Sequence, residues 1–230
     1  MKKILLTVCS ACLCLLLLLG LLDSVVLSAL NANEMASLFE TYARVPGEKP
    51  DYADVSQQLM RYLKSGDDRL LPQAGGASLF SEKENAHLKD CSALIRGMMH
   101  FRIVFLVLLV LTAVGVLLAW RRGAAREKLV TLALNGFNLA CLVLALFALA
   151  LIIWGLTDFN SLFLAFHRVV FTNDLWLLDP SKDLLIQLMP EPFFRAYAGR
   201  IAVRLAPILL MLAAVPFVRS RFKEVEAGNP

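Results

Sequence analysis

The chain has 230 residues, of which 58% are hydrophobic and 18% charged, with a formal net charge of +4 and a mean hydropathy of +0.65. Soluble domains are usually only about 45–50% apolar, so this composition excludes an ordinary soluble protein. The hydrophobic residues gather into four blocks separated by charged stretches, which is typical of an integral membrane protein.

The four hydrophobic blocks predict four transmembrane helices. Each block is close to the ~20 residues that a helix needs to cross roughly 30 Å of hydrocarbon. The apolar run from Ile4 to Leu22 exceeds the roughly 7–15 residues of a signal-peptide core, so we expect the first block to be an uncleaved span. The predicted spans are residues 1–30, 101–120, 129–155 and 201–218.

Basic residues flank these blocks on one side of the membrane if the four spans alternate in direction. Lys and Arg concentrate in short cytoplasmic flanks, so both ends of the chain are expected in the cytoplasm. Segments 31–100 and 156–200 then lie outside. The basic flanks are Lys2 with Lys3, the loop 121–128 and the tail 219–230.

Segment 31–100 is expected to form a mostly helical extracytoplasmic cap. Asp54 to Lys64 has apolar residues at helical spacing, and Gly75-Gly76 predicts a turn. Ser81-Glu82-Lys83-Glu84 has the pattern of a capping box, in which two side chains satisfy the first free N–H groups of a helix. The helix that it opens is expected to run through His87 into the second span. The predicted fold class is therefore an all-α integral membrane protein.

Segment 156–200 is too rich in aromatic and aliphatic residues for a loop that lies free in water. We expect it at the membrane surface or within the outer leaflet, with Trp176 at the level of the headgroups. Residues 184–188 are expected to begin a short helix, which Met189-Pro190 ends.

The three histidines are the residues best suited to acid–base chemistry. His87 has Glu84 and Asp90 at i−3 and i+3, on one helical face, where a carboxylate could orient the ring. His167 lies among phenylalanines, so it is either a functional or a buried structural histidine. His100 is expected at the membrane interface.

Other kinds of chemistry find less support in the sequence. HExxH, GxSxG, GxGxxG and Walker motifs do not occur, and the three histidines lack the tight spacing of zinc ligands. Four of the five cysteines lie in apolar blocks and only Cys91 lies in a polar region, so no disulfide framework is expected. Ionisable residues are nearly absent from the spans, which disfavours a transporter.

Two segments resemble the signature regions of the lipoprotein intramolecular transacylases. They are Phe80–Asp90, which contains SEKENAHLKD, and Phe166–Ile186, which contains FHRVVFTNDLWLLDPSKDLLI; Pro190–Phe194 continues the second. Cys91 stands where the family is expected to have a small aliphatic residue. The likeness in topology extends over the whole chain.

The resemblance implies a membrane enzyme of Gram-positive bacteria, with its active site on the extracytoplasmic side. It would move the sn-2 acyl chain of an S-diacylglyceryl group to the α-amino group of the N-terminal cysteine, giving a lyso-form lipoprotein. His87 and His167 match the family's paired histidines. Glu84, Asp90, Asn173, Trp176 and Asp183 are expected to support them, with Asn173 or nearby N–H groups stabilising the oxyanion.

No cofactor, metal or nucleic acid is implied, and the expected partners are the diacylated lipoprotein and membrane lipid. The oligomeric state is left open by the sequence. Two other readings remain at this point. The chain could be a non-enzymatic membrane scaffold or accessory protein, or a hydrolase that releases acyl chains from lipids or lipoproteins in the outer leaflet.

Overall fold

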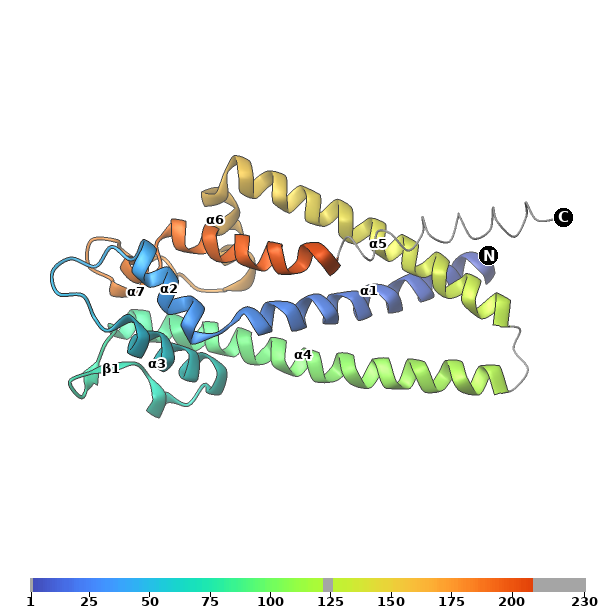
Figure 1. Cartoon of the computed structure of the whole chain (residues 1–230), viewed down its shortest axis with the longest axis horizontal. Helices are drawn as coiled ribbons and strands as arrows, with labels where there is room; N and C mark the ends of the chain where they lie inside the picture. The colour runs from blue at the N-terminus through green and yellow to red at the C-terminus, as the bar shows by residue number, and fades with distance from the viewer. Residues whose placement is uncertain (1, 122–125, 209–230) are drawn as a thin grey trace. The chain divides into compact units, whose positions relative to one another are not determined.

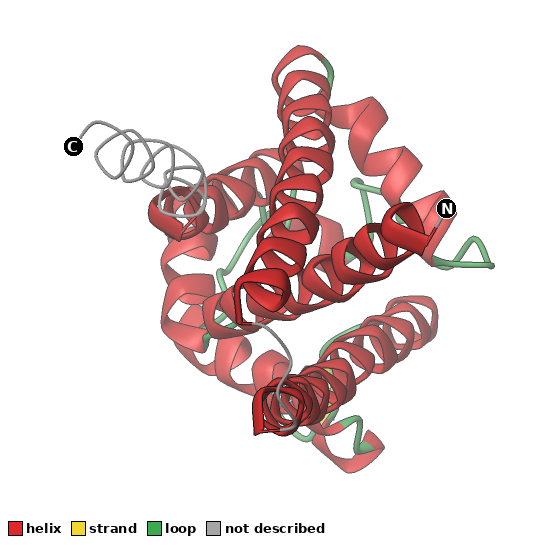
Figure 2. Cartoon of the chain, turned by 90° about the vertical axis from the view of Figure 1, so that its right-hand side faces the viewer, coloured by secondary structure: helices red, strands yellow, loops and turns green. Residues whose placement is uncertain are grey.

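The computed structural model describes residues 2–121 and 126–208, which are mostly helical (Figure 2). Its contacts divide the chain into two compact units. The first comprises residues 1–24, 102–152 and 202–230, and the second comprises residues 25–101 and 153–201. The predicted loop 121–128 and fourth span 201–218 are described only in part, and the tail 219–230 lies outside the described residues.

Three long helices supply most of the first unit (Figure 1). Among the described residues, three helices are long and apolar enough to cross a membrane, as the first three predicted spans require. Residues 201–208 are helical and continue a helix that begins at residue 191. The three long helices are α1 (Lys2–Ala29), α4 (Glu82–Arg121) and α5 (Arg126–Thr157).

Small residues allow the helices of the first unit to pack closely. A Cβ atom at Gly20 of α1 would lie 2.2 Å from Cγ of Phe105 in α4, and one at Gly136 of α5 would lie 2.6 Å from the backbone carbon of Ser10. The Ser10 hydroxyl also donates to the carbonyl of Leu132 at 3.1 Å. Close packing at small residues is a usual basis of helix association in a bilayer.

The second unit is built from short helices around one hydrophobic core. Its elements are α2 (Ala32–Tyr42), α3 (Tyr52–Ser65), the 3₁₀ turn η1 (Asp68–Leu70), β1 (Gln73–Ala74), β2 (Ala77–Ser78), α6 (Phe159–Val170), α7 (Leu184–Leu188) and the first part of α4. The core includes Phe39, whose ring stacks on Phe193 with centroids 5.5 Å apart. Segments from both halves of the sequence therefore share this core.

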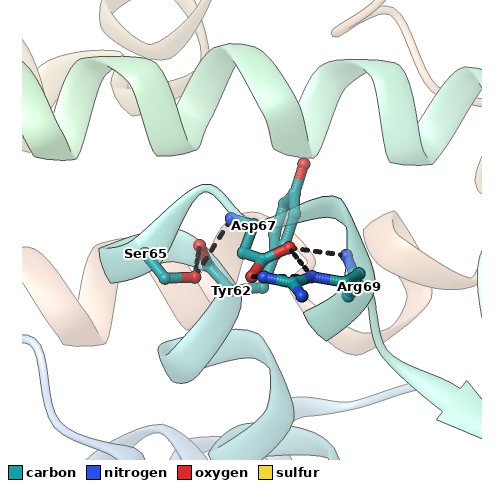
Figure 3. A network of polar contacts seen from close by, with 4 residues as sticks. All are labelled: Tyr62, Ser65, Asp67 and Arg69. Atoms are coloured by element: carbon teal, nitrogen blue, oxygen red, sulfur yellow. Dashed lines mark hydrogen bonds and ion pairs between the residues drawn. The ribbon is translucent and has the colours of Figure 1, made fainter.

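The predicted helix over Asp54–Lys64 is confirmed as α3, and Gly66 ends it in the left-handed region with φ +67°. Figure 3 shows the polar contacts that follow. The Ser65 hydroxyl donates to the Tyr62 carbonyl at 3.4 Å and accepts from the N–H of Asp67 at 3.2 Å, while Arg69 pairs with the Asp67 carboxylate. These local bonds fix the chain reversal between α3 and the hairpin.

The turn predicted at Gly75-Gly76 is confirmed, and it joins the two strands of an antiparallel hairpin in which Gln73 pairs with Ser78. The short helix predicted at residues 184–188 is confirmed as α7. Helix α6 was not predicted, because the sequence indicated only an apolar interfacial segment there. Asp158 caps it by accepting the N–H of Ser161 at 2.9 Å.

Candidate active site

The first turn of α4 holds His87 in place through the capping box predicted from the sequence. The N–H of Ser81 donates to Oε2 of Glu84 at 2.8 Å, and the N–H of Glu84 donates to the Ser81 hydroxyl at 3.3 Å. The two bonds satisfy N–H groups that a helix start leaves free. His87 follows less than one turn after Glu84 and is therefore carried by a fixed helix end.

Glu84 also joins α4 to α7. Its second oxygen, Oε1, accepts the N–H of Leu185 at 2.5 Å, and the residue is only 2% exposed. Both carboxyl oxygens therefore bond to backbone groups, and within the described residues Glu84 makes no hydrogen bond to His87. It supports the site by fixing two helices rather than by orienting the ring.

His87 is buried, with 7% of its surface exposed. Its ring meets Phe171 edge-on, with centroids 5.1 Å apart, and its Nε2 lies 3.5 Å from Sγ of Cys91, one helical turn further along α4. Its Nδ1 is buried and has no hydrogen-bond partner among the described residues. A polar atom in this position is available to a ligand.

His167 lies in the last turn of α6 and is held by its own helix. Its Nδ1 is 2.7 Å from the carbonyl oxygen of Phe163. A carbonyl only accepts, so Nδ1 carries the proton and Nε2 keeps its lone pair. The ring packs against Phe163 and Trp176, with centroids 4.0 and 5.0 Å away.

The two histidines lie side by side in the second unit, with ring centroids 6.2 Å apart. Burial lowers the pKa of His87 to about 4, helped by repulsion from His167 and opposed by the charge of Asp90. Burial also lowers the pKa of His167, against the raising effect of its bond to Phe163. Both imidazoles are therefore neutral near pH 7, the form in which a histidine accepts a proton.

A side-chain hydrogen bond between Asp90 and Asn173 joins α4 to the loop after α6. The Asn173 amide donates to Oδ2 of Asp90 at 2.9 Å, and its oxygen accepts the N–H of Leu175 at 3.1 Å. Lys83 donates to the carbonyl of Leu177 in the same loop. These bonds hold Trp176, which is 8% exposed, against His167.

The remaining candidates lie further from the pair. Oδ2 of Asp183 accepts the N–H of Asp179 at 2.6 Å and stabilises the turn that precedes α7. His100 is exposed, and its Nδ1 lies 2.7 Å from the carbonyl of Arg96. Across the described residues, no three His, Cys, Asp or Glu side chains gather closely enough to hold a metal ion.

An apolar cavity of about 390 Å³ lies beside the histidines. His87 and Cys91 line it directly, as do Phe163 and Trp176, which pack on His167. Most of the remaining wall is aliphatic or aromatic, and includes Met35, Met60, Leu88, Leu164, Phe193 and Phe194. A cavity of this kind suits an alkyl chain.

Three contacts in the site were missed by the sequence reasoning. They are the thiol of Cys91 at His87, the Phe163 carbonyl at His167 and the Phe171 ring at His87. Two of them could have been predicted from the sequence. Cys91 follows His87 by four residues and Phe163 precedes His167 by four, which is the spacing of neighbours on a helix.

A family model described as "Lipoprotein intramolecular transacylase Lit" matches residues 7–194. The chain belongs to this family. It is accordingly an acyltransferase that acts on lipoproteins, and not a non-enzymatic scaffold. Its long apolar helices agree with a membrane protein. Among curated proteins, none is similar enough to match the chain.

Solved structures share the fold. The membrane integral lipoprotein intramolecular transacylase Lit from Bacillus cereus matches with a TM-score of 0.63 and 17% identity, over 97% of this chain and 98% of that one. A variant of the same protein with one histidine changed to alanine matches with a TM-score of 0.59 and 18% identity, over 97% of this chain and 96% of that one. At this identity the likeness shows the fold alone.

Proposed function

We propose that this transacylase moves the sn-2 acyl chain of an S-diacylglyceryl group to the α-amino group of the same N-terminal cysteine, with His87 and His167 as the acid–base pair. The observation that carries the proposal is the pair itself. The ring centroids of two neutral imidazoles lie 6.2 Å apart, and one of the two, His87, lines an apolar cavity. The reaction needs this combination, because a proton must leave an amine and reach an alkoxide beside acyl chains.

His167 is the proposed base. Its Nδ1–H is committed to the Phe163 carbonyl, so Nε2 carries the lone pair that can take a proton. The amine nitrogen attacks the ester carbonyl carbon and a C–N bond forms. Nε2 takes the amine proton, the C–O bond to glycerol breaks, and the proton ends on the glycerol oxygen. Such positioned proton transfer typically contributes about 10²–10⁴ to the rate.

His87 is the proposed donor to the oxygen that becomes negative. Burial raises the pKa of the Cys91 thiol to about 12, so this thiol keeps its proton and can donate it to Nε2 of His87 at 3.5 Å. The ring proton then resides on Nδ1, the atom without a partner among the described residues. A preset donor at a developing oxyanion is the most effective kind of stabilisation in acyl transfer.

The remaining candidates have positioning roles in this proposal. The amide of Asn173 is bonded to Asp90 and Leu175, so it holds the loop that carries Trp176 instead of meeting the oxyanion. Glu84 ties α4 to α7, and Asp183 stabilises the preceding turn. The walls contributed by these segments keep water from the ester, which favours transfer to the amine over hydrolysis.

The proposed topology has four spans, both ends in the cytoplasm and the histidine pair on the extracytoplasmic side. It is supported by the basic flanks of the sequence and by the three long apolar helices of the described part. The second unit carries the site and includes the extracytoplasmic segments predicted from the sequence. Diacylated lipoproteins in the outer leaflet would reach a site on that side.

Mass spectrometry of a lipoprotein from a host that expresses this chain tests the proposal. We expect an N-acylated, S-monoacylated product with no change in total acyl mass. A product that has lost one acyl chain would instead identify a hydrolase. Unchanged conversion by both His87→Ala and His167→Ala would disprove the acid–base assignment.

A further inference from the structure

A second cleft opens beside the apolar cavity, within the same unit. Its volume is about 480 Å³. It shares four lining residues with the cavity, which are Asn160, Phe163, Pro180 and Ile186. The two spaces are therefore adjoining, and their common wall includes the residue whose carbonyl holds His167.

We infer that this cleft binds the peptide chain that follows the N-terminal cysteine of the lipoprotein substrate. The inference rests on the proposed function, in which the acyl chains and the amine meet at the histidine pair. A peptide brings an N–H and a carbonyl with every residue, and burying these groups without partners is costly. The apolar cavity offers few such partners, whereas the adjoining cleft is lined by several polar side chains.

The cleft supplies polar groups that are not already in use. Among the described residues, the side chains of Arg44 and Asn160 have no hydrogen bond or ion pair, although both line the cleft. By contrast, the amide of Gln187 donates to the carbonyl of Pro180 at 3.1 Å, and Glu191 pairs with Arg195. Among the described lining residues, Arg44 and Asn160 thus have side chains whose donors are free to bind a ligand.

The backbone around both free groups is fixed. The N–H of Arg44 donates to the carbonyl of Gln187 at 2.8 Å, which attaches the segment after α2 to α7. Pro180, Pro190 and Pro192 form much of the wall, and proline has few conformations to lose. A ligand that binds here orders little of the protein, which favours affinity.

The distance between Asn160 and His167 along α6 indicates which residue of the peptide the cleft would contact. Asn160 precedes His167 by seven residues on one helix, which corresponds to about 10 Å at 1.5 Å per residue. An extended peptide covers about 3.3 Å per residue. The amide therefore lies within reach of about the third residue after the reacting cysteine, and Arg44 at the same cleft favours an acidic side chain there.

The test compares a short and a long synthetic substrate with the full-length enzyme in detergent or lipid discs. The short substrate is S-diacylglyceryl cysteine amide. The long substrate is S-diacylglyceryl cysteine followed by five residues, and it is made in three versions with Asp, Ala or Lys as the third residue after the cysteine. Conversion of the amide to its N-acyl product is measured first, so that a failure of the proposed function is registered separately. The result of interest is the ratio of kcat/KM for the long substrate to that for the short one.

For the wild type we expect a higher kcat/KM with the long substrate, highest with Asp. Arg44→Ala and Asn160→Ala should each lower the ratio by up to about tenfold, the effect of one lost hydrogen bond. Arg44→Glu should reverse the preference from Asp to Lys. Lys182→Ala removes an exposed charge that does not line the cleft, so it should keep the wild-type ratio.

Two results would overturn the inference. A wild-type ratio of one would show that the enzyme does not bind the peptide. An equal loss on both substrates in Arg44→Glu would assign the cleft to something that the substrates share, such as a lipid headgroup.

Discussion

Nε2 of His87 lies 3.5 Å from Sγ of Cys91, one turn further along α4. The contact was not expected from the sequence, since the resemblance to the family predicts a small aliphatic residue at position 91. In the proposed mechanism this contact sets the tautomer of the donor histidine. The sulfur then positions His87 and does not act as a nucleophile, because burial raises the thiol pKa to about 12.

The Cys91 contact is tested by Cys91→Ala. We expect kcat to fall about three- to tenfold with little change in KM, because the weak S–H···N bond that fixes His87 is lost. The imidazole ¹⁵N shifts of His87 should move at the same time. Cys141→Ala, in the other unit of the chain, is the matched control. Wild-type kcat together with unmoved His87 shifts would mean that the thiol has no such role.

The histidine pair is tested by single substitutions. His87→Ala and His167→Ala should each lower kcat by about 10²–10⁴, because each removes one of the two proton-handling groups. The rate of N-acyl product formation by mass spectrometry measures this loss. His100→Ala serves as the control and should retain the wild-type rate, since His100 is exposed and, within the described part of the chain, its side chain bonds only to the Arg96 carbonyl.

The pH dependence of stability follows from the lowered pKa values. The unfolded chain takes up protons at His87 and His167 below about pH 6.5, whereas the folded pair resists them. The contribution of these two histidines to the free energy of unfolding is therefore constant above pH 6.5. It declines as the pH falls from 6.5 toward 4, by about 3 kcal/mol for His87. Thermal unfolding in detergent at pH 7, 6 and 5 should show a steeper decline for the wild type than for His87→Gln. The same pH dependence of the unfolding temperature in both proteins would show that His87 does not have a lowered pKa in the folded state.

Glu84 offers a test of the scaffold. Glu84→Gln replaces one of two acceptor oxygens with an NH₂ group that faces the N–H of Ser81 or Leu185, and such a buried mismatch costs about 1–3 kcal/mol. We expect a lower unfolding temperature. Glu82→Gln, at an exposed position in the same turn, should change it little. Equal stability of the two variants would show that the link between α4 and α7 contributes nothing.

Much of the fold could be predicted because it depends on local patterns. The capping box at Ser81 and Glu84 and the amphipathic spacing of α3 are short-range features, and both were found as expected. The two-residue strands at Gln73 and Ala77 are too short to show any periodicity. Helix α6 was missed although its apolar residues repeat at helical spacing as clearly as those of α3 and Asp158 caps it, because the segment was interpreted from its overall apolar composition.

The site could be predicted only in part for a different reason. The sequence singled out His87 and His167 by their chemistry, but their approach to 6.2 Å depends on segments 80 residues apart. The bond from Asn173 to Asp90 and that from Leu185 to Glu84 are likewise long-range. No spacing rule indicates such pairs, because tertiary packing alone brings them together.

The bond from His167 to Phe163 connects two residues of one helix. The tautomer of the proposed base is therefore set as soon as α6 forms, without help from the substrate or from any other element. If His167 is the base, its ring is already in the required tautomer when a lipoprotein arrives, so none of the substrate's binding energy is needed to set it. In the proposed mechanism α6 is thus a preorganised element.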